Sequence, residues 1–402
     1  MLSPDKYVMK VLTIFGTRPE AIKMAPVIHA LAAASECTVK VCVTAQHRKM
    51  LDQVLELFSI IPDYDLDVMQ DNQDLFDLSS RILLSLRKVL QQEQPDIILV
   101  QGDTTTCFIG SLAAFYLRIP VGHIEAGLRT HDISAPFPEE ANRAMTARLA
   151  ALHFAPTEQA CQNLYQEGIP QSSVHLTGNT VIDALFWIQQ KVQQQADRAI
   201  NPASFASARS LVQEGKPYIL ITGHRRENFG DGFQNICKAV AVLADRHPEI
   251  GFIYPVHLNP HVQQPVHALL GKKKNIYLIP PLDYAPFVQA MAQARLILTD
   301  SGGVQEEAPS LGKPVLVMRE STERPEAVEA GTVRLVGTDK ELIIRETERL
   351  LTDEDAYQSM ASKSNPYGDG RAAARIVQAL KAFRADRADR ADRANDYSSA
   401  LF

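Results

Sequence analysis

The sequence is poor in cysteine and tryptophan and has no long apolar run. Its five cysteines form no Cys-x-x-Cys pair and lie mostly in apolar runs, so they are expected to be buried thiols rather than a disulfide or zinc framework. No run approaches the roughly 18 apolar residues of a membrane-spanning helix. The segment 1–10 lacks the apolar stretch of a signal peptide. These absences predict a cytoplasmic protein.

Basic residues are not in excess either. The 402 residues include 41 Lys and Arg against 47 Asp and Glu, a net charge of −6, whereas a general nucleic-acid-binding protein normally has a basic balance. Hydrophobic residues make up 46% of the chain, which excludes disorder over most of its length. Because one hydrophobic core rarely serves more than about 250–300 residues, two to three domains are expected.

The chain does contain a regular alternation of short β-rich runs and helical stretches, such as the expected helices at 19–34 and 50–58. Strands are predicted at 9–15, 38–44, 96–101, 121–124 and 152–155, and then at 218–222, 252–257, 275–279, 295–299, 314–318 and 333–336. Near-continuous apolar strands separated by helices are typical of buried parallel sheets. Two such series predict an α/β protein with two Rossmann-like, doubly wound domains.

The change between the two series falls near 178–183. The polar segment 191–215 is expected to be helix plus loop, and 61–77, rich in Asp and Gln, to be a surface loop. From Arg384 the chain repeats Arg-Ala-Asp three times. We interpret this tail as a solvated helical or frayed extension, with a partner-binding segment as the alternative.

The first motif with chemical meaning directly follows the first strand. Gly16 permits a tight turn, and Pro19 suits the first turn of the next helix. Arg18 lies before that helix and Lys23 about one turn into it, so together with free N–H groups they could hold a pyrophosphate. The plain alternative is a strand–turn–helix with solvent-facing basic residues.

A second motif follows a strand of the second series. Ser301 is a good helix cap, and Gly302 and Gly303 allow a ligand close to the backbone. Glu306 and Glu307 suit the first helical turn, where carboxylates are favoured, but a carboxylate just past a phosphate loop can also bind a ribose. The motif therefore favours a nucleotide diphosphate. The sequence contains neither a Walker A loop nor Gly-x-Gly-x-x-Gly.

Further cations follow two other strands of the second series. His224, with Arg225 and Arg226, lies where open α/β sheets bind ligands, and Arg324 follows the strand at 314–318. A lone histidine is more often structural, but this one is expected to converge with the Ser301 loop.

Carboxylates follow strands of the first series. Asp103 and Glu125 end two successive strands, and Glu139 and Glu140 lie a little further on. Each alone could be a helix cap or a surface charge. Several carboxylates at one sheet edge, opposite a cationic nucleotide site, indicate acid–base chemistry. The histidines show no paired metal-ligand spacing, so no metal is expected.

Taken together, these motifs resemble the non-hydrolysing bacterial UDP-N-acetylglucosamine 2-epimerases over about residues 10–370. The resemblance rests on Phe15-Gly16-Thr17-Arg18-Pro19-Glu20, Thr44-Ala45-Gln46-His47-Arg48, Gly102-Asp103-Thr104-Thr105, His123-Ile124-Glu125-Ala126-Gly127-Leu128-Arg129, Thr177-Gly178-Asn179-Thr180, Gly223-His224-Arg225-Arg226-Glu227-Asn228, Asp300-Ser301-Gly302-Gly303 and Glu323-Arg324-Pro325-Glu326.

The resemblance implies a GT-B fold with the active site in a cleft between the domains. It implies an N-terminal domain of residues 1–178, a UDP-binding domain of 179–370, and a C-terminal helix at about 371–385 that packs back on the first domain. Residues 386–402 remain a tail. It further implies a homodimer without cofactor or metal that interconverts UDP-GlcNAc and UDP-ManNAc and supplies ManNAc for cell-surface polysaccharide.

The same resemblance assigns roles to single residues. The catalytic group is Asp103, Glu125, Glu139 and His224. Substrate-binding residues are Arg18, Lys23, Asp103, Glu125, His224, Leu282, Phe287, Ser301, Gly302, Gly303, Glu307 and Arg324, with Phe287 against the uracil. Gln46 and Arg48 match a part that binds an activating UDP-GlcNAc in some members. This chain departs from the family at Phe137, where Trp is common, and at Leu282, where Gln is common.

The chemistry expected from the resemblance is elimination of UDP to 2-acetamidoglucal, followed by re-addition with the proton delivered to the other face. Three alternatives stay open: a hydrolysing epimerase that releases ManNAc and UDP, a GT-B glycosyltransferase, and a nucleotide-sugar-binding protein without catalysis.

Overall fold

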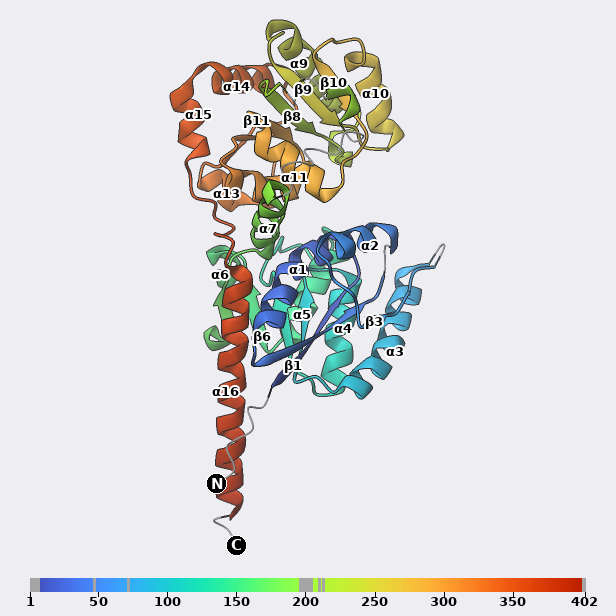
Figure 1. Cartoon of the computed structure of the whole chain (residues 1–402), viewed down its shortest axis with the longest axis vertical. Coiled ribbons are helices and arrows are strands. Elements are labelled where there is room, and N and C mark those ends of the chain that lie inside the picture. The colour runs from blue at the N-terminus through green and yellow to red at the C-terminus, as the bar shows by residue number, and fades with distance from the viewer. Residues whose placement is uncertain are drawn as a thin grey trace. The chain divides into compact units, whose positions relative to one another are not determined.

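A computed structural model describes residues 8–45, 48–70, 73–194, 205–208, 211 and 214–399. The chain forms two compact units (Figure 1). Unit 1 combines Met1–Ala184 with Gly368–Phe402, and unit 2 is Leu185–Tyr367.

Unit 1 contains a parallel sheet with the strand order β3-β2-β1-β4-β5-β6-β7 within the described residues. Its strands are β1 (Met9–Phe15), β2 (Cys37–Val43), β3 (Tyr64–Asp65), β4 (Ile97–Gln101), β5 (Val121–Ile124), β6 (Leu152–Ala155) and β7 (Val174–Leu176). On one face of the sheet, apolar side chains of β1 and β4 form a buried cluster with those of two helices, α3 and α4. The residues of β1 and β4 that point to the other face are buried as well, and this burial on both faces explains why the strands are almost uniformly apolar.

Helices flank this sheet on both faces. They are α1 (Arg18–Ala33), α2 (Arg48–Leu57), α3 (Leu75–Glu93), α4 (Thr105–Tyr116), α5 (Glu139–Leu149), α6 (Glu158–Gln166) and α16 (Ala372–Ser399). The helix α7 (Thr180–Gln194) begins in unit 1 and ends in unit 2. The first turns of α16 pack on α1, and its ribbon continues past the rest of unit 1 (Figure 1). The helix expected near 371–385 thus runs on through the Arg-Ala-Asp repeat, whose residues, Ala included, lack strong helix breakers.

Unit 2 repeats the same plan with the strand order β10-β9-β8-β11-β12-β13 among its described residues. The strands are β8 (Tyr218–Thr222), β9 (Gly251–Pro255), β10 (Ile276–Ile279), β11 (Leu296–Thr299), β12 (Val315–Val317) and β13 (Val333–Leu335). The helices are α9 (Asp231–Arg246), α10 (Pro260–Leu270), α11 (Tyr284–Gln293), α12 (Gly302–Glu307), α13 (Pro325–Glu329), α14 (Lys340–Thr352) and α15 (Glu354–Ala361).

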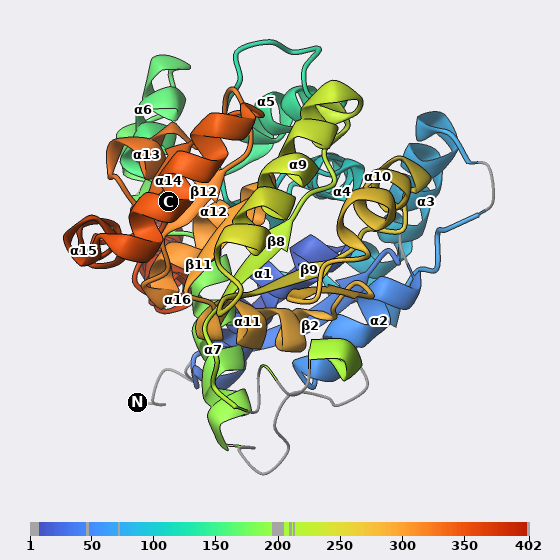
Figure 2. The same cartoon turned by 90° about the horizontal axis from the view of Figure 1, so that it is seen from above.

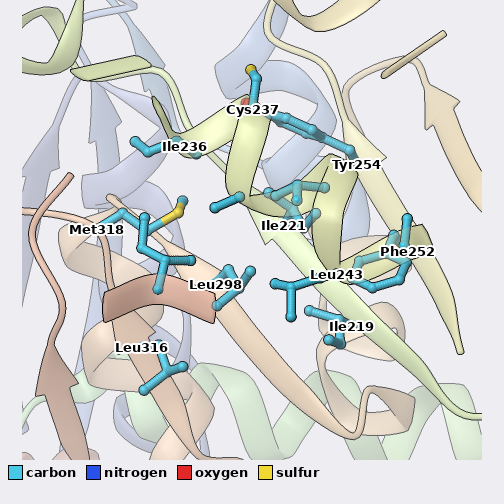
Figure 3. Packing of buried hydrophobic residues seen from close by; sticks show 14 of the residues in the cluster. Ile219, Ile221, Ile236, Cys237, Leu243, Phe252, Tyr254, Leu298, Leu316 and Met318 are labelled. Atoms are coloured by element: carbon cyan, nitrogen blue, oxygen red, sulfur yellow. The ribbon is translucent and has the colours of Figure 1, made fainter. Parts of the chain in front are cut away.

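The core of unit 2 lies between its sheet and the helices α9, α10 and α14, which share one face (Figure 2). Ile219 and Ile221 alternate toward this face and meet Leu298 of β11 and Leu243 of α9 (Figure 3). The predicted α/β class with two doubly wound sheets is confirmed. In both sheets the strand order reverses at one point, between β1 and β4 and between β8 and β11, where such folds bind ligands.

The loop prediction for 61–77 was incomplete. The two-residue strand β3 lies there and pairs with the edge of β2, and α3 begins at Leu75. So short an edge strand leaves no alternation of apolar residues for a sequence pattern to detect. Within the described residues, no helix is both long and apolar enough to cross a membrane.

Candidate functional site

Polar residues follow the carboxyl ends of β1, β4 and β5, which are neighbours in the unit 1 sheet. Arg18 begins α1 after β1, Asp103 follows β4, and Glu125 follows β5. Because these strands are parallel and adjacent, the three residues leave the sheet at the same edge.

Glu125 forms an ion pair with Lys23 of α1, and its Oε2 atom also accepts a hydrogen bond from Asn179 Nδ2 at 3.1 Å. The side chains of Lys23 and Glu125 are only 14% and 9% exposed. The backbone of Glu125 has φ 65°, a left-handed conformation that costs energy for a residue with a long side chain. Such strain is typical of functional positions. The partner of Lys23 in the structure is thus the Glu125 carboxylate, whereas the motif predicted a pyrophosphate.

One oxygen of Asp103 accepts two hydrogen bonds from Arg143 of α5. Arg143 Nη2 and Nε lie 2.7 and 3.0 Å from Asp103 Oδ2, and Asn142 donates to the Asp103 carbonyl at 2.9 Å. The Asp103 side chain is 27% exposed, so it is oriented by a cation and still accessible.

Glu139 and Glu140, adjacent at the start of α5, have different surroundings. Glu140 is 3% exposed and accepts hydrogen bonds from the backbone N–H groups of Thr130 and His131, at 3.0 and 3.2 Å, and from Arg143. Glu139 is half-buried and makes no ion pair with the described residues. Glu140 therefore holds a loop, whereas Glu139 keeps its carboxylate for other contacts.

A buried carboxylate, Glu20, joins the loops after β1 and β4. Its Oε2 atom accepts the N–H groups of Gly16 and Thr17 at 3.0 and 2.8 Å, and its Oε1 atom accepts Thr104 Oγ1 at 2.7 Å. Burial raises the pKa of Glu20, against these hydrogen bonds. A Cβ on Gly16 would lie 2.0 Å from Thr44 Oγ1, so only glycine fits this turn. Glu20 therefore connects the loop that carries Arg18 to the loop that carries Asp103.

His123 of β5 is completely buried, and its Nε2 atom contacts the carbonyl of Gly102, next to Asp103, at 2.7 Å. Burial lowers the pKa of His123 to about 4, so the ring is neutral at neutral pH. Arg129 forms a bidentate pair with Glu167 at 2.6 and 2.9 Å. His123 therefore supports the loop that carries Asp103, whereas Arg129 is paired with Glu167.

In unit 2, His224 and Asp300 follow the adjacent strands β8 and β11. Asp300 Oδ2 accepts the backbone N–H groups of His224 and Arg225, both at 2.8 Å, and His224 Nδ1 lies 3.3 Å from Asp300 Oδ1. The His224 ring also stacks on His257, with centroids 5.5 Å apart. Burial lowers the pKa of His224, while Asp300 acts in the opposite direction. His224 therefore has a carboxylate on one side and an aromatic ring on another.

Arg324 lies over the start of α12. A Cβ on Gly302 would come within 2.6 Å of the Arg324 guanidinium, and Arg324 Nε donates to Glu306 Oε1 at 2.7 Å. Glu306 is 2% exposed, while the Arg324 side chain is 21% exposed. The guanidinium is thus fixed by a buried carboxylate and remains open to an anion.

Arg319 joins the loops that carry His224 and Arg324. It is 4% exposed and forms ion pairs with Glu227 and with Glu323, the latter at 2.7 Å. The Arg319 guanidinium lowers the pKa of Glu323 to about 2. The loop of His224 and the loop of Arg324 therefore each form an ion pair with the same buried cation.

The remaining predicted ligand contacts of unit 2 lie on or near α11 and α12. Tyr284 donates to Glu307 Oε1 at 2.5 Å, so this carboxylate is oriented within α12. Leu282 is 9% exposed and Phe287 is half-buried on α11. Ser301 lies between β11 and α12, its N–H donating to Thr299 Oγ1 at 2.9 Å, and Gly303 follows within α12.

Of the two residues assigned to an activator, Gln46 lies outside the described residues. Arg48 begins α2 and forms ion pairs with Asp65 at 2.6 Å, Asp52 at 3.3 Å and Asp67 at 3.5 Å. The described part of the chain contains no cluster of three histidine, cysteine or acidic side chains arranged to hold a metal ion.

The structure brings together several predicted residues and adds partners that the motifs did not single out. Sequence reasoning missed Asn179, Arg143, Asp300, Glu306 and Arg319 as contributors. Asn179 and Asp300 lie inside quoted motifs directly after strands, which is a usable signal. Arg143 and Arg319 are 40 and 92 residues from Asp103 and Glu227, so only the fold joins them.

Comparison with known proteins identifies the family. The family model for UDP-N-acetylglucosamine 2-epimerase matches residues 29–381. The UDP-N-acetylglucosamine 2-epimerase of Escherichia coli K12 is 59% identical over 373 residues, covering 93% of this chain and 98% of that protein. A crystal structure of the Neisseria meningitidis UDP-GlcNAc 2-epimerase bound to UDP-GlcNAc has 52% identity and a TM-score of 0.83, covering 92% and 99% of the two chains.

A structure of Staphylococcus aureus MnaA with UDP has 47% identity and a TM-score of 0.80, covering 94% of this chain and 97% of that one. At such identity over nearly the whole length, the shared fold and motifs reflect common descent. The chain belongs to the UDP-N-acetylglucosamine 2-epimerase family, a family of isomerases.

Proposed function

We propose that the protein interconverts UDP-GlcNAc and UDP-ManNAc without net hydrolysis, by elimination of UDP to 2-acetamidoglucal and re-addition. The observation that carries the proposal is Glu125: a carboxylate on a strained backbone, paired with Lys23, at the sheet edge that also holds Asp103. The solved relative with bound UDP-GlcNAc supports the substrate class.

The reaction explains why both an anion site and carboxylates are needed. The C2 proton of a sugar nucleotide is not next to a carbonyl, so a base alone does not remove it. As the bond from C1 to UDP breaks, positive charge grows at C1 and makes the C2 proton acidic. The electron pair of the broken bond goes to UDP, and a carboxylate accepts the proton. In the re-addition UDP forms the C1–O bond again, and the proton is delivered to the opposite face of C2.

Unit 2 is proposed to hold UDP. Its cations His224 and Arg324, with the Ser301 and Gly302 backbone, are suited to the charge that develops on the leaving diphosphate. Such fixed electrostatic stabilisation is usually the largest contribution to catalysis. Phe287 and Leu282 are proposed to lie at the uracil, and Glu307, oriented by Tyr284, is proposed to bind the ribose.

Unit 1 is proposed to supply the acid and base, with Arg18 as a further contact to the diphosphate. Lys23 stabilises the ionised form of Glu125 by their ion pair. Lys23 is therefore also proposed to keep Glu125 competent as a base. Asp103, oriented by Arg143, and Glu139 are the other proton carriers. General acid–base groups typically contribute about 10²–10⁴-fold in rate.

Incubation with UDP-GlcNAc in D₂O tests the proposal. We expect UDP-ManNAc with deuterium at C2, observed by NMR over time, without any added acceptor. Epimer lacking deuterium at C2 would exclude proton abstraction from C2. Accumulation of free ManNAc with UDP would instead indicate a hydrolysing enzyme, and turnover that requires an acceptor would indicate a glycosyltransferase.

Glu125→Gln is the matched active-site variant, since it removes the charge and keeps the shape. It should bind UDP as the wild type does, by calorimetry, and lose most turnover, by about 10²-fold or more. A wild-type rate in this variant would remove Glu125 from the mechanism.

We further propose that the protein is a cytoplasmic homodimer whose product supplies ManNAc for cell-surface polysaccharide. Arg48, with Gln46, is proposed to contribute to an activating UDP-GlcNAc site. The ion pairs of Arg48 with Asp52 and Asp65 would then have to be exchanged for a diphosphate.

A further inference from the structure

Asp300, between β11 and α12, is a buried carboxylate with two unequal oxygens. Its side chain is 0% exposed. Oδ2 accepts the N–H groups of His224 and Arg225 at 2.8 Å and lies 3.4 Å from Asn228 Nδ2. Oδ1 is buried and has no hydrogen-bond partner among the described residues, and His224 Nδ1 lies 3.3 Å from it. A buried carboxylate oxygen without a donor is costly, so this atom requires an N–H group facing it.

The other groups around His224 cannot take this role. His257, which stacks on His224 with an interplanar angle of 17°, accepts the Asn259 backbone N–H at its own Nδ1 atom at 3.1 Å. That nitrogen is therefore already occupied by a backbone N–H group. Arg225, on the loop of His224 itself, is a cation that disfavours a second charge nearby. Asp300 is thus the one described group facing His224 that favours a proton on it.

We infer that Asp300 is a positioning residue that fixes the tautomer of His224, with one proton on Nδ1 facing Asp300 and Nε2 left free to face the ligand. The inference rests on the proposed function, because it deepens the role of His224 at the diphosphate. The His224 side chain is 40% exposed, so a ligand can reach the ring.

This tautomer matters for the leaving group. With Nδ1–H directed at Asp300, Nε2 carries a lone pair that can take a second proton from the solvent when the diphosphate binds. The resulting imidazolium lies between two anions, Asp300 and the diphosphate. When the C1–O bond breaks, the electron pair goes to the diphosphate oxygen and the Nε2 proton is available to it, while the C2 proton goes to a carboxylate of unit 1. The opposite tautomer offers no basic nitrogen at this position.

Asp300→Asn tests the inference because it reverses the dipole that faces His224. The amide oxygen can still accept the two backbone N–H groups, and the NH₂ group then faces Nδ1 and donates to it. In the ligand-free enzyme, ¹⁵N NMR of the histidine rings, assigned by comparison with His224→Gln, should show Nδ1 protonated in the wild type. In Asp300→Asn it should show Nε2 protonated. His257→Phe preserves the stacked ring and should leave the tautomer unchanged.

Kinetics give an independent readout. Asp300→Asn should lower kcat by about 10²-fold or more with a much smaller change in KM, and should alter the pH profile limb that reports His224. In a His224→Gln background, the same substitution should cost almost nothing, because the pair acts as a unit.

The same tautomer in wild type and Asp300→Asn would overturn the inference, and so would an equal kinetic cost with and without His224. A wild type that makes no UDP-ManNAc would instead refute the proposed function and leave the NMR result standing.

Discussion

At the scale of single residues, two adjacent glutamates show how strongly surroundings decide a role. Glu140 accepts two backbone N–H groups and pairs with Arg143, whereas Glu139 has no ion-pair partner in the described chain. Glu139→Gln should therefore lose turnover with unchanged stability. Glu140→Gln should lower the free energy of unfolding by about 1–3 kcal/mol. Urea unfolding and initial rates on both variants check this, and equal effects on stability would contradict the assignment.

Buried histidines in unit 1 predict how stability depends on pH. His123 and His153 are neighbours across β5 and β6 and are 0% and 1% exposed. Burial lowers the pKa of His123 to about 4 and that of His153 to about 3. An unperturbed histidine has a pKa of about 6.5. At a pH between these lowered pKa values and about 6.5, the unfolded chain therefore binds more protons than the folded chain. The free energy of unfolding should therefore fall as the pH decreases from about 6.5, by about 1.4 kcal/mol per pH unit for each ring.

His153→Gln isolates one of these contributions, since it keeps a polar side chain that does not titrate. Urea unfolding followed by circular dichroism at pH 5, 6 and 7 should show a pH slope that is smaller by about one proton than in the wild type. The exposed His131, changed to Asn, which tolerates its positive φ, should keep the wild-type slope. An unchanged slope in His153→Gln would mean that this ring is already accessible to protons in the folded protein.

The positions of the candidate site residues in the fold were easier to predict from the sequence than their partners. Asp103, Glu125, His224 and Ser301 were singled out because each follows a strand, and parallel strands end at a common edge. The pairing of Lys23 with Glu125, 102 residues apart, could not be found, since motif spacing reports on one loop at a time. The motif predicted a diphosphate as the partner of Lys23. A cation near the start of a helix suits a diphosphate and a carboxylate equally well, so the motif alone does not distinguish between them.

At the scale of elements, α12 depends on a glycine that admits the Arg324 guanidinium. A Cβ at Gly302 would lie 2.6 Å from Arg324 Nη1, whereas a Cβ at Gly303 would meet nothing closer than Glu307 Oε2 at 3.9 Å. Gly302→Ala must displace Arg324 from its ion pair with Glu306, so we expect a loss of about 1–3 kcal/mol in stability. UDP affinity should also fall, by about tenfold for each 1.4 kcal/mol.

Gly303→Ala is the matched comparison for this helix. It adds the same methyl group one residue later without contacting Arg324, so the free energy of unfolding should change by less than about 0.5 kcal/mol. Thermal unfolding and calorimetry with UDP distinguish the two variants. Equal stability of both would show that Arg324 moves aside at no cost.

Most strands were predicted within a residue or two because both sheets are buried on two faces. The β5 and β8 boundaries agree with the apolar runs at 121–124 and 218–222. The strand β3, which was not predicted, is a two-residue edge strand, and the helix expected at about 371–385 continues as α16 into the tail that was interpreted as a helical or frayed extension. An apolar pattern reports on burial, so it is least informative for an edge strand and for a helix segment rich in charged residues.

At the scale of the whole molecule, two helices of unit 1 that pack together, α3 and α4, carry exposed apolar side chains. Leu84 is 57% exposed on α3, and Phe115 and Tyr116 are 56% and 64% exposed at the end of α4. Single exposed apolar residues are ordinary, but a group of them on adjacent helices is typical of a protein–protein interface. This surface is our candidate for the interface of the proposed homodimer.

Light scattering coupled to size exclusion tests this interface. The wild type should have about twice the chain mass of 44.5 kDa, because burying such residues between two copies removes apolar area from water. Leu84→Glu should shift the mass toward that of one chain, since it would place a charge inside the interface without disturbing the core of unit 1. Leu258, 68% exposed in unit 2, provides the control, and Leu258→Glu should leave the mass unchanged. A wild type that is monomeric at micromolar concentration, or a Leu84→Glu variant of dimeric mass, would place the exposed α3 and α4 residues outside any dimer contact.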